Sequence, residues 1–306
     1  MKLTVTAVLA VLAFAVLGQN SSPLPGYSLS PWQNLDCAKA LLQKAQQKLK
    51  DGTLTPKDRI RIVFYGQSLA AKDNAWAAKI FPAEMTKKYG DIFSFENKAR
   101  GGWVAGWLLA TYLEDLAGTD PDLVIIHDYP SPKREYYACL LFDGIKTKAE
   151  FDEWYNTIKP EAEANVKRYK LNKENFDNKL GKPGIRNMTN SRGSRVEVLL
   201  LGDHYRNATG KDVKYDKFDK YGDENSFQFY PKWAKEQQLG YLDLRSLWKE
   251  VLLKEYGNMS SESRAHYLRP DGEHLISAGQ LLWAYCVLRY FDINYDYHEA
   301  KAAAPK

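Results

Sequence analysis

Five short apolar or β-rich runs, separated by amphipathic stretches, constrain the fold of this chain more than any other feature. Apolar residues at helical spacing mark segments between and around them, such as Cys37–Lys50 and Ile276–Phe291. Strands that alternate with helices form a parallel sheet covered on both faces. We therefore predict an α/β fold, a three-layer α/β/α sandwich around a mainly parallel sheet. The predicted strands are Arg61–Tyr65, Ile92–Asn97, Leu123–His127, Val196–Leu201 and Tyr241–Leu244.

The first residues have the anatomy of a secretory signal peptide. Lys2 is followed by the uncharged run Leu3–Leu17, which Gly18 ends. This run is shorter than the ~20 residues needed to span a bilayer. We expect cleavage near Gly18, a secreted, extracellular protein, and no membrane attachment once the signal is removed. The oligomeric state stays open.

The rest of the chain is expected to form one α/β domain at 59–293. The segment 19–58 precedes it and contributes a helix that packs on the domain. A C-terminal tail follows at 294–306, and we expect Ala300–Lys306 to be frayed.

An insertion is predicted at about 146–195, where the composition changes to Lys, Glu, Asn and Tyr. We expect a surface helix at Lys148–Arg168 and irregular structure at Leu171–Ser194. Two interpretations stay open for this segment: a solvated excursion, or a lid or subsite wall.

Charge and cysteine content exclude several classes of protein. The 43 basic and 38 acidic residues give a net charge of +5 without a long run of one sign, so nothing indicates a nucleic-acid partner. Three cysteines are too few for a disulfide framework and match no zinc or redox spacing. Cys286 is expected as a buried thiol, and one bridge from Cys37 to Cys139 or Cys286 stays open. Four sequons favour a glycoprotein: Asn20, Asn187, Asn207 and Asn258.

Polar residues follow several predicted strands, and ligands of parallel sheets bind beyond the carboxyl ends of the strands. The positions are Gly66-Gln67-Ser68, Asn97–Gly102, His127-Asp128 and Asp203-His204. Ser68 lies where a strand gives way to a helix. There its hydroxyl is exposed and its own N–H can stabilise an oxyanion, although a serine at this place is also an ordinary helix N-cap.

A second motif precedes the last apolar helix. In Arg269–Leu275, an Asp-x-x-His pattern places Asp271 where it can orient the imidazole of His274. His274 would then take the proton from Ser68. The alternative is a surface aspartate beside a solvated histidine.

These motifs resemble those of the SGNH/GDSL hydrolase superfamily, over about Lys48 to Phe291. Ile62–Ser68 is similar to the first block, with Gly-Gln-Ser where Gly-Asp-Ser is commoner. Asn97–Trp103 is similar to the second block, which implies that the N–H of Gly102, or of Gly101 as the fallback, lies in an oxyanion hole. Asp271 and His274 match the last block. The resemblance implies a flavodoxin-like order of strands.

The third block of the family is absent. Its usual Gly-x-Asn-Asp should follow the strand that ends near Ile126, but the chain reads His127-Asp128-Tyr129-Pro130-Ser131. The resemblance makes His127 the replacement for the family's asparagine donor, with Ser131 behind it. The expected oxyanion hole is therefore Ser68, Gly102 and His127.

The function expected from these motifs is a serine esterase with an acyl-enzyme, a Ser68, His274 and Asp271 triad, and no cofactor or metal. Its substrate would be a carboxylic ester, such as an acylated polysaccharide. One alternative is a non-catalytic carbohydrate-binding protein of the same fold, because 8 Trp and 20 Tyr offer faces for sugar rings. The other is a metal-dependent hydrolase that uses four strand-end residues: His127, Asp128, Asp203 and His204.

Overall fold

The computed structural model describes residues 29–71, 74–103, 105–127, 134–164, 174–207, 222–223 and 225–303. The predicted signal peptide, Asn20, Asp128 and Ser131 lie outside these residues. Within them no helix is both long and apolar enough to cross a membrane.

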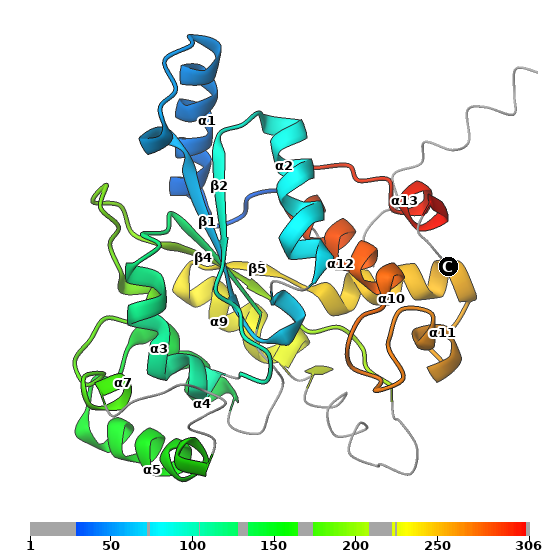
Figure 1. Cartoon of the computed structure of the whole chain (residues 1–306). Helices are drawn as coiled ribbons and strands as arrows, with labels where there is room; N and C mark the ends of the chain where they lie inside the picture. Colours follow the sequence, from blue (N-terminus) through cyan, green and yellow to red (C-terminus); the bar gives the residue numbers. More distant parts are fainter. Residues whose placement is uncertain are drawn as a thin grey trace, which may run out of the picture.

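A five-stranded, all-parallel sheet forms the centre of the molecule (Figure 1). The strands lie in the order β2-β1-β3-β4-β5, which is the flavodoxin-like order. This confirms the predicted α/β fold class. The strands are β1 Ile60–Gly66, β2 Phe93–Asn97, β3 Leu123–His127, β4 Glu197–Leu201 and β5 Gly240–Leu242.

Helices cover both faces of this sheet, because the strand residues alternate between two cores. Ile62 and Phe64 belong to one core with apolar residues of α1, α2, α10 and α12, whereas Val63 and Tyr65 belong to the other with those of α3, α4 and α9. In Figure 1, α3 and α4 lie on one side of the sheet and α2 and α12 on the other. The helices are α1 Asp36–Lys50, α2 Phe81–Tyr89, α3 Ala105–Ala117, α4 Arg134–Asp143, α5 Lys148–Ala164, α7 Glu174–Asp177, α9 Tyr230–Gln237, α10 Leu244–Tyr256, α11 Ser261–Ala265, α12 Ser277–Tyr290 and α13 Tyr297–Ala303.

The strand bounds differ little from those predicted. β3 runs over Leu123–His127, as expected. The last strand ends earlier than predicted because the Asp243 side chain accepts a hydrogen bond from the N–H of Ser246 at 2.9 Å and so caps α10. Leu244 therefore belongs to the helix.

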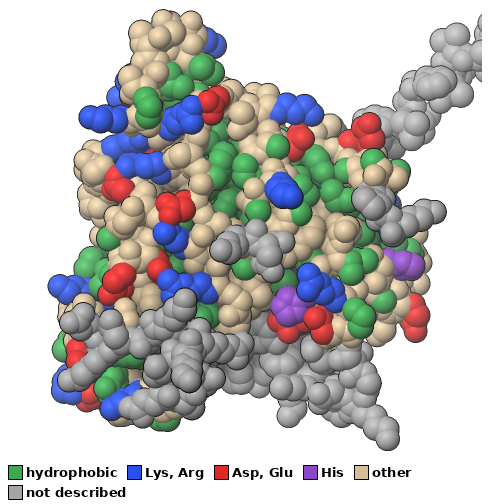
Figure 2. Space-filling view, viewed as in Figure 1, with side chains coloured by type: hydrophobic (Ala, Val, Ile, Leu, Met, Phe, Trp, Pro, Cys, Tyr) green, Lys and Arg blue, Asp and Glu red, His purple; other side chains and the backbone are tan. Residues whose placement is uncertain are grey.

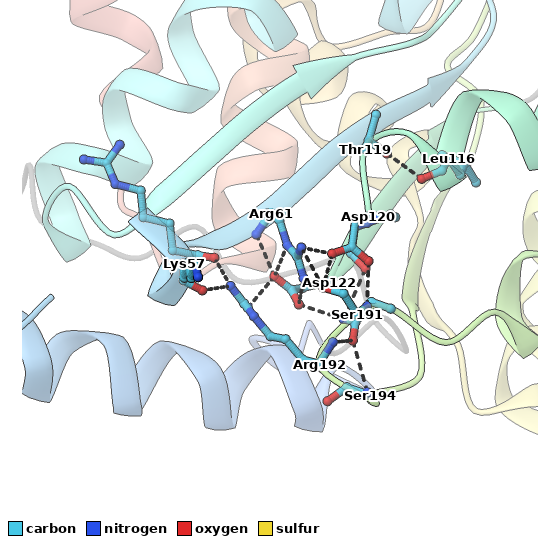
Figure 3. A network of polar contacts seen from close by, with 12 residues as sticks. Lys57, Arg61, Leu116, Thr119, Asp120, Asp122, Ser191, Arg192 and Ser194 are labelled. Carbon is cyan, nitrogen blue, oxygen red and sulfur yellow. Dashed lines mark hydrogen bonds and ion pairs between the residues drawn. The ribbon is translucent and has the colours of Figure 1, made fainter. Parts of the chain in front are cut away.

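The described part of the insertion makes buried contacts with the rest of the domain. Trp154 of α5 is fully buried and donates its indole N–H to the carbonyl of Gly106 at 2.7 Å. Near the end of the insertion, Arg192 pairs with the buried Asp122 at 2.7 Å, and Arg61 pairs with the same carboxylate (Figure 3). This ion-pair cluster lies at the amino ends of β1 and β3, the opposite end of the sheet from Ser68.

The expectation of a frayed C-terminus is wrong for residues 300–303, which belong to α13. Tyr297 of α13 is buried, and its hydroxyl bonds to that of Tyr267 at 2.9 Å. Lys301 pairs with Glu255 at 2.6 Å and lies 4.7 Å from the centre of the Tyr267 ring. These contacts fix the helix to α10 and to the segment before α12.

The mixed surface charge and the buried Cys286 agree with the sequence predictions, whereas the cysteines form no disulfide. On the face in Figure 2, acidic and basic side chains are interspersed. All three cysteines are free, and Cys286 is buried as predicted, which raises the pKa of its thiol.

Asn187 and Asn258 are exposed, but Asn207 is buried and donates to the carbonyl of Ser261 at 2.7 Å. A glycan on Asn207 is therefore incompatible with this fold.

Candidate active site

The turn that carries Ser68 is dictated by Gly66, the last residue of β1. Gly66 has a φ of +114°, and a Cβ at this position would lie 2.0 Å from the carbonyl oxygen of His127. Only glycine therefore fits where β1 passes β3. The next residue, Gln67, donates its backbone N–H to the same carbonyl at 3.2 Å. The chain then turns into a short 3₁₀ helix, Ser68–Ala70.

The local structure excludes the N-cap interpretation of Ser68. The capping position of the short helix belongs to Gln67, which makes no capping bond with its side chain. The Ser68 hydroxyl instead lies 3.2 Å from Nε2 of His274. Ser68 itself is only partly buried, so its hydroxyl lies where a ligand can reach it.

The segment Arg269–Leu275 is a tight loop that its own aspartate organises. Oδ1 of Asp271 accepts hydrogen bonds from the N–H groups of Glu273 and His274, both at 2.9 Å. Its other oxygen, Oδ2, lies 2.9 Å from Nδ1 of His274. One carboxylate thus shapes the loop and orients the imidazole.

Asp271, His274 and Ser68 form a continuous hydrogen-bonded series. With Nδ1–H donating to Asp271, Nε2 of His274 is the acceptor that faces the Ser68 hydroxyl. Burial alone would raise the pKa of Asp271, but the N–H groups of Glu273 and His274 and the imidazole outweigh it and lower this pKa. The carboxylate therefore stays ionised. The site is open, since the side chains of Asp271 and His274 are 47% and 36% exposed.

The turn that contains Gly101 and Gly102 lies beside Ser68. A Cβ built on Gly101 would be 4.0 Å from Cβ of Ser68, which places Gly101 next to the serine. Among the described residues, the N–H groups of Ser68 and Gly101 have no hydrogen-bond acceptor. Gly102 lies one residue further along the same turn, with a φ of +76°. The N–H of Gly102 likewise has no backbone acceptor among the described residues, so Gly102 stays the predicted donor and Gly101 the fallback.

His127 does not lie where an oxyanion donor is needed, which corrects the sequence prediction. Its ring is fully buried, with Nδ1 3.3 Å from the amide nitrogen of Gln67 and Nε2 3.2 Å from Asp203. Both nitrogens are therefore engaged inside the protein. The physical reason is strand alternation: His127 shares a face with Leu123 and Ile125, so its ring points into the layer of α12 and packs on Trp283.

The described residues of the proposed metal site instead bond to one another or to a backbone carbonyl. Asp203 accepts from His127, while His204 lies 3.0 Å from the carbonyl oxygen of Glu273. In the described part of the chain, no three His, Cys, Asp or Glu side chains gather in a way that could hold an ion. Asp128 is outside those residues.

The tryptophans do not offer the sugar-binding faces considered from composition. All eight are buried: Trp32, Trp76, Trp103, Trp107, Trp154, Trp233, Trp248 and Trp283. They pack the two cores, as aromatic side chains most often do. This removes the tryptophans, but not the tyrosines, from the observation behind the non-catalytic alternative.

Sequence reasoning missed Arg206 and the side chain of Glu273. Arg206 is almost completely buried, and its guanidinium lies 3.2 Å from the Glu273 carboxylate. The sequence offers two signals for them. Arg206 lies three positions after Asp203, and Glu273 is a second acidic residue between Asp271 and His274.

No protein-family model matches this sequence, and no curated protein matches it. The chain is similar in structure to Axe2, an acetylxylan esterase from Geobacillus stearothermophilus, with 17% identity, a TM-score of 0.45, and 77% of this chain and 95% of that chain covered. It is also similar to LAE5, an alpha/beta hydrolase from the metagenome of Lake Arreo, Spain, with 15% identity, a TM-score of 0.44, and 76% and 95% covered. Both similarities are distant, so the chemistry of this chain has to follow from its own residues.

Proposed function

We propose that this chain is a secreted serine esterase of the SGNH/GDSL type that hydrolyses carboxylic esters through an acyl-enzyme. The observation that carries the proposal is the series of hydrogen bonds from Asp271 through His274 to Ser68, at 2.9 and 3.2 Å. A nucleophile, a base and a carboxylate that orients the base are the three parts needed for acyl transfer.

In the first half of the reaction, Nε2 of His274 takes the hydroxyl proton of Ser68 while Oγ attacks the carbonyl carbon of the ester. The tetrahedral intermediate collapses when His274 returns this proton to the leaving alkoxide, and the alcohol departs. In the second half, His274 takes a proton from water, whose oxygen attacks the acyl carbon. The carboxylic acid leaves, and His274 returns the proton to Ser68.

We assign the oxyanion hole to the backbone N–H groups of Ser68 and Gly102, with Gly101 as the fallback. All three lack a backbone acceptor among the described residues, and the glycine turn lies beside Ser68. Donors fixed by the backbone need no reorganisation as negative charge develops on the carbonyl oxygen. Gly66 supports this arrangement, since its carbonyl accepts the N–H of Arg100 at 2.9 Å and so holds the glycine turn against the serine turn.

The substrate class that we favour is an acyl group, such as acetyl, on a carbohydrate. The side chains of His274 and Asp271 are more than one third exposed, so the acid–base half of the site is accessible to a bulky alcohol such as a polysaccharide. The signal-like N-terminus supports an extracellular site of action, where such polymers occur.

Replacing Ser68 by alanine tests the proposal. We expect Ser68→Ala to lower ester cleavage by about a thousandfold or more, because only binding and the oxyanion hole remain. The substrates are p-nitrophenyl esters of rising chain length and acetylated xylan, and exposed Ser94→Ala is the matched control. Activity retained within about tenfold in Ser68→Ala would refute the serine mechanism.

Two further measurements separate the alternatives. Loss of activity in EDTA with recovery in zinc or manganese would favour a metal-dependent hydrolase. Secretion is tested by expressing the full chain in a eukaryotic host, where the protein in the medium should begin near residue 19.

A further inference from the structure

A chain of buried polar side chains begins directly beneath Ser68. Gln67, the residue before the serine, contacts His127 twice, through its backbone N–H to the His127 carbonyl and through its amide to Nδ1. Nε2 of His127 then lies 3.2 Å from Asp203, at the end of β4. All three side chains are at most 2% exposed. The turn that carries the nucleophile is thus fixed to the Asp203 carboxylate.

The same carboxylate also holds the loop that carries the base. Asp203 accepts from Nε of Arg206 at 3.2 Å and from its Nη2 at 3.4 Å. The remaining nitrogen, Nη1, forms an ion pair with Oε1 of Glu273 at 3.2 Å, without the geometry of a hydrogen bond. Arg206 therefore connects Asp203 to Glu273. Asp203 also holds the Ser68 turn, and Glu273 directly precedes His274.

Backbone contacts run parallel to this bridge. His204 lies 3.0 Å from the Glu273 carbonyl, and Asn207 donates its N–H to the Gly272 carbonyl at 2.8 Å. The segment 203–207 after β4 thus supports both residues that separate Asp271 from His274. Further contacts that hold the loop are internal, such as the Asp271 turn and the hydrogen bond from the Arg269 N–H to the His274 carbonyl at 2.7 Å.

A buried ion pair is a poor way to gain stability, because desolvation offsets most of its attraction. Burial opposes ionisation of Asp203, but Arg206, followed by His127, lowers its pKa well below the usual range, so the charges are retained. The hydrogen bonds to Asp203 fix the direction of the Arg206 guanidinium, and its charge then attracts the Glu273 carboxylate at 3.2 Å. An apolar cluster would cover the loop but would not fix where Glu273 lies.

We propose that Arg206 is a positioning residue, which holds Glu273 and thereby sets the distance from His274 to Ser68. The inference rests on the proposed function, since only an acyl-transfer mechanism makes that distance decisive. The guanidinium of Arg206 is anchored by Asp203, which is itself held by His127 and Gln67. A misplacement of about 1 Å at such a site lowers the rate by about a hundredfold, although no reacting group is removed.

Glu273→Gln is the variant that tests this role, because it removes the charge opposite Arg206 and keeps the backbone contacts. We expect kcat to fall by about ten- to a hundredfold with KM within about twofold, and the rate of Ser68 labelling by a fluorophosphonate to fall in parallel. The matched control is Glu114→Gln, which likewise removes the carboxylate partner of a buried cation, Lys179, but on α3. It should leave kcat and labelling unchanged.

Arg206→Lys supplies a second measurement, since one ammonium cannot reach Asp203 and Glu273 as the guanidinium does. We expect it to lower kcat per folded molecule at least as much as Glu273→Gln does. If Glu273→Gln keeps kcat and labelling within about twofold of the parent, or loses no more than Glu114→Gln, the positioning role is wrong. Ser68→Ala separates this failure from that of the proposed function, because an active Ser68→Ala would overturn the serine mechanism itself.

Discussion

The fully buried imidazole of His204 should make this protein lose stability in mild acid. His204 is packed between Trp248 and Trp283 and lies 3.0 Å from the Glu273 carbonyl. Burial lowers its pKa from 6.5 to about 3, with Asp203 opposing this and Arg206 and His127 adding to it. The ring is therefore neutral in the folded protein at a pH where the unfolded chain is protonated.

The sign and size of the effect follow from this difference. Between about pH 6.5 and pH 3 the unfolded state binds one more proton, so the free energy of unfolding falls as the pH falls through this window. Each pH unit below the unfolded value removes a little over ~1 kcal/mol. From about pH 6 to about pH 4, His204 alone should remove about 2 to 3 kcal/mol.

Urea unfolding of the parent and of His204→Gln at a series of pH values isolates this contribution, because all other titrating groups are common to both. We expect His204→Gln to be destabilised at neutral pH, and the gap to shrink by about 2 to 3 kcal/mol by about pH 4. His204→Phe is the second variant if the glutamine does not fold, and His298→Gln controls for loss of an exposed histidine. A gap that stays constant across this range would refute the reasoning.

Two other predictions concern stability. Gly66→Ala should cost about 3 kcal/mol or more in urea unfolding, because its Cβ would meet the His127 carbonyl; Gly193→Ala, with a φ of +75° but open space around it, should cost clearly less, and equal losses would contradict the steric argument. Lys301→Met should cost about 1 kcal/mol by removing the ion pair with Glu255 and the contact with the Tyr267 ring, whereas no loss relative to the exposed Lys254→Met would show that α13 is not held by this lysine.

Local pattern was enough to predict most of the sheet and the meeting of Ser68 with His274. The aliphatic run before Gly202 and the run Leu123–His127 are short and continuous, which favours strands that are buried on both faces. Asp271 and His274 are three residues apart, so a single turn accounts for their contact. Ser68 follows a strand end, and parallel strands bring such ends to one edge.

The parts that could not be predicted depend on long-range pairs of charged or aromatic side chains. Arg192 reaches Asp122 across 70 residues, and Lys179 reaches Glu114 across 65, and neither pair has a local signature. His127 lies at the predicted end of the sheet, but its side chain lies on the face of Leu123 and Ile125, not at the edge where an oxyanion donor is needed.

The position of Gly66 and Ser68 at the end of the first strand has a consequence for how the protein is made. The nucleophile is synthesised 206 residues before the base that it contacts, and its turn rests on the carbonyl of His127 from a later strand. A growing chain, or a product truncated before residue 274, therefore carries Ser68 without His274. On the proposed mechanism, hydrolysis requires the loop Arg269–Leu275 to pack against the Ser68 turn, so a nascent chain that lacks this loop would be inactive.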